Sequence, residues 1–292
     1  MSLTRSLLTL CAVIIPALEA GAQDWHAEAS YTWAENLSRT SYAPDRENGA
    51  VYDGSVTAEW HRQLAPNWTM LVNAEAGLEQ VPAFPGLDSV HLGPRADLRW
   101  KFGLGPFAPV LTFSSAASRD ELHEHGRSHW KLEGRVGLSK RLTETWRMAA
   151  SGEWQEDYAR DHPFDIRNRR LSLETNWDVA EGWQLSAGGS RLWGELTANA
   201  NQDIWGQALS GGFGRTVANY YNTVPYEHST AFETDWIAYR IDCRADIWWA
   251  SVSFALGANT SLPLRYESVK VVNRAHVSYN SEFWSLSIVH RF

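Results

Sequence analysis

The sequence predicts an all-β protein, a transmembrane antiparallel up-and-down β-barrel of about twelve strands. Three observations predict it. Apolar and polar residues alternate in one segment after another, which is the periodicity of a strand with two different faces. Short and long connections between these segments also alternate. Finally, the 292 residues include 16 tryptophans, an unusually high number, and several of them lie where segments begin or end.

The start of the chain has the pattern of a secretory signal peptide. Arg5 precedes an apolar run from Leu7 to Leu18, and the triplet Ala20-Gly21-Ala22 supplies small residues before a cleavage site. The run is shorter than the ~20 apolar residues that a membrane-spanning helix needs. We therefore expect residues 1–22 to be a signal peptide and residues 23–292 to form the barrel as one domain.

Composition and charge exclude some classes of protein. A net charge of −8 provides no basic surface of the kind that nucleic-acid binding needs. The mean hydropathy of −0.37 is low for a membrane protein, but a barrel strand needs apolar residues only at alternate positions. Cys243 is the only cysteine after residue 22, so no disulfide can form within the mature chain, and we expect it to act as a small apolar residue.

The alternation is clear in segment 68–80, where Met70 and Val72 share one face while Asn73 and Glu75 share the other. Such segments predict strands that are apolar on one side and charged on the other. Thirteen segments of this kind are present, at 26–33, 54–62, 68–80, 90–102, 108–118, 128–142, 146–158, 168–179, 183–195, 234–245, 249–258, 267–279 and 283–292.

The length of the chain and the pattern together bound the number of strands. About 22 residues for a strand with its connection give about 12 strands in ~270 residues, and such barrels usually have an even number. The alternation changes phase between Ile241 and Val252. Either segment 234–245 lies outside the membrane, which leaves twelve strands, or a further strand lies in 204–216, which gives fourteen. We expect twelve.

The lengths of the connections and the positions of the tryptophans distinguish the two ends of the predicted barrel. Short turns such as Ala65-Pro66-Asn67 interleave with longer polar loops such as 80–89. An indole ring places its apolar body in hydrocarbon and its N–H in the wet interface. We expect an interface girdle beside the short turns, formed by Trp68, Trp100, Trp146, Trp177 and Trp183, and a second near the opposite strand ends, formed by Trp33, Trp130 and Trp154. The alternative, tryptophans in the core of a soluble β-sandwich or propeller, fits poorly with the charged second face.

The end of the chain resembles that of Gram-negative outer-membrane β-barrel proteins. Trp284, Leu286, Ile288 and the terminal Phe292 occupy alternate positions, and His290 departs from the apolar residue or tyrosine usual at its position. Members of that family commonly end in an aromatic residue on such a strand, which the barrel-assembly machinery recognises. The resemblance implies a location in the outer membrane, contact with its lipids, and that machinery as a partner during biogenesis.

The charged positions of these segments should face the barrel interior. Acidic residues gather in the first three segments and basic residues in the next five, so one acidic and one net basic wall are expected, because consecutive strands are neighbours. The expected pore-lining residues are Glu59, Glu75, Glu79, Arg95, Arg99, Lys101, Lys131, Arg135, Arg147 and Arg170.

Such walls favour a narrow channel for small solutes, anionic ones among them. The alternative is that the charges pair and plug the interior, which would make the barrel structural or associated with export or assembly. Asp24-Trp25-His26-Ala27-Glu28 also resembles, over these few residues, the first strand of small porins for acidic oligosaccharides, whose interiors are lined by arginines. The loop 197–232 could bind a surface partner or fold inward as a constriction.

An outer-membrane hydrolase is the remaining class considered. His228-Ser229, next to Glu227, and His276 with Ser278 bring a serine close to a histidine, but nothing in the pattern orients the histidine. We expect no catalytic residues and no cofactor. Histidines on a solvated loop are usually not ligands, and we expect no metal site at the histidine-rich stretch formed by His123, Glu124, His125 and His129.

Overall fold

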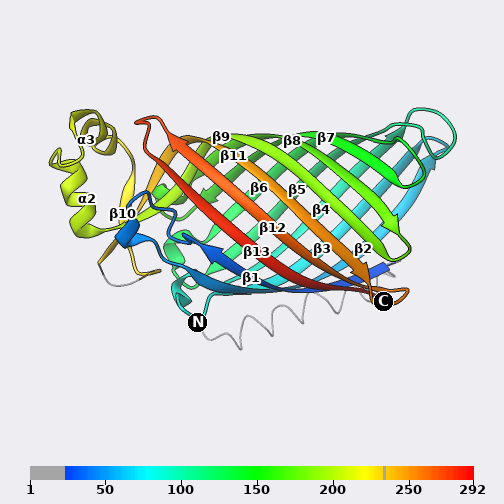
Figure 1. Ribbon diagram of the computed structural model, residues 1–292, viewed down its shortest axis with the longest axis horizontal. Coiled ribbons are helices and arrows are strands. Elements are labelled where there is room, and N and C mark those ends of the chain that lie inside the picture. Colours follow the sequence, from blue (N-terminus) through cyan, green and yellow to red (C-terminus); the bar gives the residue numbers. More distant parts are fainter. Residues whose placement is uncertain (1–23, 233–234) are drawn as a thin grey trace.

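A computed structural model describes residues 24–232 and 235–292, so the expected signal peptide lies outside the described part. Figure 1 shows strands that slant around a cylinder, with short turns at one end and long loops and helices at the other. The strands are β1 (Asp24–Glu35), β2 (Gly49–Ala65), β3 (Trp68–Gln80), β4 (Ser89–Lys101), β5 (Val110–Leu122), β6 (His129–Arg141), β7 (Trp146–Ala159), β8 (Ile166–Ala180), β9 (Trp183–Asn201), β10 (Tyr226–Ser229), β11 (Trp236–Ala255), β12 (Thr260–Asn273) and β13 (Ser278–Arg291).

The helical elements are short and lie at the long-loop end. They are α2 (Gln202–Leu209), α3 (Arg215–Tyr221) and four 3₁₀ turns, η1 (Ala43–Asp45), η2 (Pro85–Leu87), η3 (His125–Arg127) and η4 (His162–Phe164). Among the described residues, no helix is long and apolar enough to cross a membrane.

Twelve of the described strands close into an antiparallel barrel, as predicted. Each pairs with its neighbour in sequence, except that β9 pairs with β11, and the ring closes where β1 pairs with β13. The short strand β10 is not a barrel strand, because it pairs only with the outer end of β11. Within the ring itself, closure leaves no strand edge unpaired.

The predicted count was right, but the account of the extra segment needs correction. Residues 236–245 and 249–255 of the two segments belong to a single strand, β11, and residues 204–216 include most of α2 and the start of α3. The fourteen-strand alternative is therefore wrong. The change of phase does not mark a break, because Ile241 is buried in a core on one face of the strand while Val252 lies on the opposite face. The apolar side switches along one continuous strand.

Along the middle of the barrel the apolar face points outward. Leu171 and Leu173 on β8 are 59% and 55% exposed, and Val136 on β6 is 48% exposed. Tryptophans lie in neighbouring pairs at both ends of this belt. At the short-turn end, Trp68 stacks on Trp100 with ring centroids 5.5 Å apart, and Trp146 pairs with Trp177; towards the long loops, Trp33 pairs with Trp284.

Three successive long loops share one design, in which a side chain caps the last strand amide. The amides of Val81, Leu122 and Ala159 donate to Asp88 Oδ1, Ser128 Oγ and Asp165 Oδ1 at 2.7, 2.9 and 2.7 Å. Neighbouring loops also bond to one another, since the Glu124 amide donates to Gly86 O and the Asp161 amide to Gly126 O, each at 3.1 Å. At Gly126 an added Cβ would lie 2.0 Å from Asp161 Oδ2, so a larger residue there would require the Asp161 side chain to move. The loops form a continuous belt around part of the mouth.

The assignment of faces can be tested on two adjacent positions of β8. Leu173→Arg puts a charge into the outward apolar belt and should lower the free energy of unfolding in lipid by about 2 to 4 kcal/mol near the midplane. Ser172→Arg is the matched control, because Ser172 faces inward opposite Ser151 and Ser190. Denaturant unfolding in vesicles measures both, and equal costs would show that the faces are misassigned.

Candidate functional site

The interior contains a cavity of about 450 Å³ between β4, β5, β6 and β7, near the short-turn end. Its described walls combine small residues such as Thr112, Ser114 and Gly137 with many charges. On inward positions they carry six cationic side chains and one carboxylate, namely Arg95, Arg99, Lys101, Arg135, Arg141 and Arg147, with Asp97. The cavity is therefore strongly basic.

The single carboxylate serves two of these cations. Arg95 Nε donates to Asp97 Oδ1 at 3.0 Å, and Arg99 Nη2 lies 3.8 Å from Asp97 Oδ2. By contrast, the side chains of Lys101, Arg135 and Arg147 make no hydrogen bond or ion pair with any described residue. Unpaired cations around a partly enclosed space create a positive potential that attracts anions.

The structure places the remaining expected pore residues outside this cavity. Lys131 Nζ pairs with Glu133 at 2.7 Å, and Arg170 Nε donates to Ser190 Oγ at 2.8 Å. Glu75 Oε1 lies 3.2 Å from the Nε2 atom of His91. The acidic residues Glu59 and Glu79 belong to β2 and β3, beside the basic wall. Of the ten expected residues, the cavity brings together Arg95, Arg99, Lys101, Arg135 and Arg147.

The alternative catalytic and metal sites are not assembled as clusters. Ser229 Oγ donates to Glu124 Oε2 at 3.1 Å, while His228, its neighbour on β10, lies on the other strand face. Glu124 and His129 are separately engaged, by Arg127 and by Asp120. His276 is a turn residue with a φ of 62°.

A different set of possible ligands occurs at the short-turn end. Asp24, Glu59 and His61 form the one group of three such residues within 4.8 Å in the described part of the chain. Arg291 Nη2 already lies 2.5 Å from Asp24 Oδ1. The guanidinium of Arg291 therefore already supplies a positive charge beside these possible ligands.

At the long-loop end, β9 and β11 continue beyond their neighbours. Pairing with β8 ends at Gly194 and pairing with β12 ends at Cys243, whereas the β9–β11 pairing runs on to Asn201. With β10 added at the edge of β11, this part forms a three-stranded ribbon, residues 194–201, 226–229 and 236–243, here called the cover (Figure 1).

One face of the cover is apolar and packs against the two helices. Tyr239 lies against Trp205, with ring centroids 4.7 Å apart, and Trp205 also contacts Tyr221. Tyr220 replaces the missing β12 partner of β11 at Asp242, because its hydroxyl accepts a hydrogen bond from the Asp242 amide at 3.0 Å. Burial raises the pKa of Tyr220 to about 12, so its hydroxyl stays protonated at neutral pH.

The other face of the cover contacts long loops from several sides of the mouth. The Asn199 amide donates to Ser38 O at 3.0 Å, and Thr197 Oγ1 donates to Pro163 O at 3.0 Å. At the tip, Trp236 packs on Phe232, which packs on Phe84 of the β3–β4 loop. These loops precede β2, β8 and β4, so the cover extends across the mouth.

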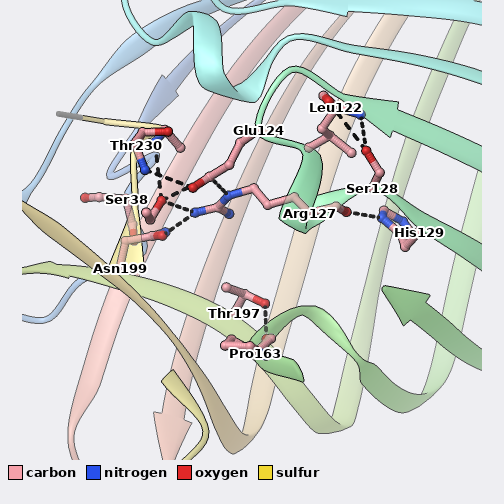
Figure 2. Close-up of polar contacts among 12 residues, drawn as sticks. Ser38, Leu122, Glu124, Arg127, Ser128, His129, Pro163, Thr197, Asn199 and Thr230 are labelled. Atoms are coloured by element: carbon pink, nitrogen blue, oxygen red, sulfur yellow. Dashed lines mark hydrogen bonds and ion pairs between the residues drawn. The ribbon is translucent and has the colours of Figure 1, made fainter. Parts of the chain in front are cut away.

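A buried ion pair joins the cover to the loop before β6, and Figure 2 shows the group. Arg127 Nε lies 2.5 Å from Glu124 Oε2, and both side chains are nearly inaccessible. The guanidinium also donates to Asn199 Oδ1 at 2.7 Å and Ser229 Oγ at 2.9 Å, while the Thr230 amide donates to Glu124 Oε1 at 2.8 Å. Burial lowers the pKa of Arg127, and the adjacent Glu124 carboxylate opposes that shift.

Comparison with solved structures supports the barrel assignment. An outer-membrane channel from Pseudomonas putida F1 is similar, with a TM-score of 0.51 and 13% identity, over 92% of this chain and 95% of that chain. The fold is that of an outer-membrane porin-like β-barrel. The NanC porin has a TM-score of 0.47 and 7% identity over 90% of this chain and 98% of its own. No family model and no curated protein matches the sequence.

The ion pair can be tested by removing its acidic member. Glu124→Ala leaves Arg127 buried without a counter-charge, a change that typically costs about 3 to 5 kcal/mol, and we expect the cover to open locally. Hydrogen exchange of the amides in 195–201 should rise relative to the barrel strands. Glu121→Ala is the control, because Glu121 pairs with Arg119 at 2.8 Å on the exposed surface, where such a pair contributes about 0 to 1 kcal/mol. Unchanged protection in Glu124→Ala would contradict the role of the pair.

Proposed function

We propose that this chain is an outer-membrane channel for small anionic solutes, with its long-loop end facing outward. The observation that carries the proposal is the basic cavity, in which Lys101, Arg135 and Arg147 have no partner in the part of the chain that the structure describes. Barrel walls of low dielectric surround the cavity and strengthen its field relative to bulk water. An anion entering the interior would replace part of its hydration with these cationic groups.

The path favours small solutes. A barrel of about 12 strands lies between filled barrels of about 8 and open porins of about 16, and the cover reduces the opening further. Inward carboxylates on β2 and β3 stand beside the basic wall, so an anion is drawn towards β4–β7 and repelled from β2–β3. This separation of charge would orient a dipolar solute as it passes.

A structural barrel with a permanent plug is the second candidate. The observation that favours it is the set of contacts between the cover and several loops, including the buried Arg127–Glu124 pair. Single-channel recording separates the two functions, because a permanent plug gives no conductance. We assign no catalytic role, since the Ser229 hydroxyl is engaged by Glu124 and His228 faces away from it.

Two partners follow from the proposed location. Lipids would surround the outward apolar belt, and the barrel-assembly machinery would insert the chain. The residues expected to signal to that machinery lie on the outward face of β13 or just beyond it, and Phe292, at the short-turn end, is 72% exposed. The other members of this set are Trp284, Leu286 and Ile288.

The channel proposal predicts a charge-dependent selectivity in planar bilayers. Arg135→Glu with Arg147→Glu should shift permeability from anions towards cations, because both side chains line the cavity. The shift should shrink as salt rises, since the Debye length falls from about 10 Å at 0.1 M to about 3 Å at 1 M. Arg160→Glu makes the same type of charge change on an exposed loop and serves as the control. If the ratio of anion to cation permeability is the same in the cavity variant as in wild type, solutes do not pass this wall.

A further inference from the structure

We propose that the outward surface of β8, β9 and β11 binds the phosphate groups of lipids in the leaflet at the long-loop end. The surface consists of Arg167, Arg169, Arg191 and Arg244, with Trp193 among them, and is here called the arginine patch. All four arginines are exposed. This inference uses the membrane location proposed above but does not depend on solute passage.

Strand register brings the arginines together. Arg169 is paired with Trp154 on one side and with Trp193 on the other, and Trp193 is paired in turn with Arg244. Paired residues on neighbouring strands share a face, and adjacent strands lie about 4.8 Å apart. Arg169 and Arg244 therefore flank Trp193 at a backbone separation of about 10 Å. Arg191 lies one outward position below Trp193 on β9, and Arg167 one outward position above Arg169 on β8.

The acidic side chains of this surface do not balance its cations. Asp246 lies 2.5 Å from Arg191 Nε and 3.7 Å from Arg244 Nε, so one carboxylate serves two guanidiniums. Glu156 lies 3.6 Å from Arg167 Nε. Arg169 has no hydrogen bond or ion pair with any described residue. An outward cation at the edge of an apolar belt is unfavourable without a counter-ion.

The tryptophans indicate the depth of the patch. Trp154 and Trp193 are 40% and 42% exposed, and Leu171 and Leu173 continue the outward face of β8 towards the middle of the barrel. Indole rings favour the boundary between hydrocarbon and headgroups. Arginines in the same row therefore reach the headgroup layer. A guanidinium can bind a phosphate through two parallel N–H donors, which makes phosphate the matching headgroup chemistry.

The patch is local rather than a ring around the barrel. Beyond the Trp33–Trp284 pair, on the other side of the molecule, the next outward pair is Glu35 with Glu282, two carboxylates. A lipid phosphate would be repelled there and attracted at β8–β11. A second protein is a less suitable occupant, because Leu171 and Leu173 place the lower edge of the patch within the apolar belt.

Lipid retention by the full-length barrel tests the inference. The probe is bisphosphorylated lipid A, added to the detergent-purified protein and counted by native mass spectrometry. Wild type should retain it, and Arg169→Gln with Arg244→Gln should bind it at least tenfold more weakly. Lipid A from which both phosphates have been removed should bind wild type as weakly as the bisphosphorylated form binds the double variant.

The matched control is Arg119→Gln. Arg119 is an outward arginine on β5 that lies 5.8 Å from the Trp130 ring but is paired with Glu121, so its loss should leave lipid retention unchanged. Heat-modifiable migration in gels confirms that each variant is folded. If the double variant does not fold, Arg169→Lys, which keeps the charge but loses the bidentate geometry, should still weaken binding.

Three results would overturn the inference. Equal retention by wild type and a folded double variant would show that the patch is not the site. Equal binding of the dephosphorylated lipid would show that apolar contact alone is responsible. An equal loss in Arg119→Gln would indicate a general effect of outward charge. None of these results bears on ion selectivity in planar bilayers, so the channel proposal is tested independently.

Discussion

Backbone pairing is the constraint on which this structure depends. In hydrocarbon every N–H and C=O group needs a partner within the protein, and a sheet meets that need only by closing on itself. The β1–β13 and β9–β11 pairings complete the ring. Once the ring is closed, each strand has one face towards lipid and one towards the interior. The apolar outside and the charged inside are both consequences of closure.

Charges that must leave the lipid face gather in the interior, where they either pair or stay hydrated. Many pair with the next inward residue on the same strand, as in Arg95–Asp97, Lys131–Glu133 and Arg265–Glu267. Positions i and i+2 share a face, so these pairs form locally and neutralise parts of both walls. The cavity is basic because Lys101 and Arg147 have no carboxylate two residues away, and because Glu133, two residues from Arg135, pairs with Lys131 instead.

Beyond the lipid the same strands follow a different rule. The outer face there meets water and the long loops, so the charged residues Arg240 and Asp242 of β11 alternate with Ile241 and Cys243, which are buried. The cover thereby gains an apolar core shared with α2 and α3 and a polar face directed at the loops. Its attachment relies on Arg127, whose burial is tolerated because Glu124, Asn199 and Ser229 surround its guanidinium.

The sequence by itself determined the barrel, its twelve strands, the direction of each face and the tryptophans at both ends, because period two, turn length and strand ends are local properties. It also placed Arg95, Arg99 and Arg135 on inward positions. Only the tertiary structure decided that two segments form one strand, that residues 194–201, 226–229 and 236–243 form a cover, and which inward charges are left unpaired. Those outcomes depend on contacts between residues far apart in the chain, such as Ser38 with Asn199 and Arg127 with Ser229, which no local pattern encodes.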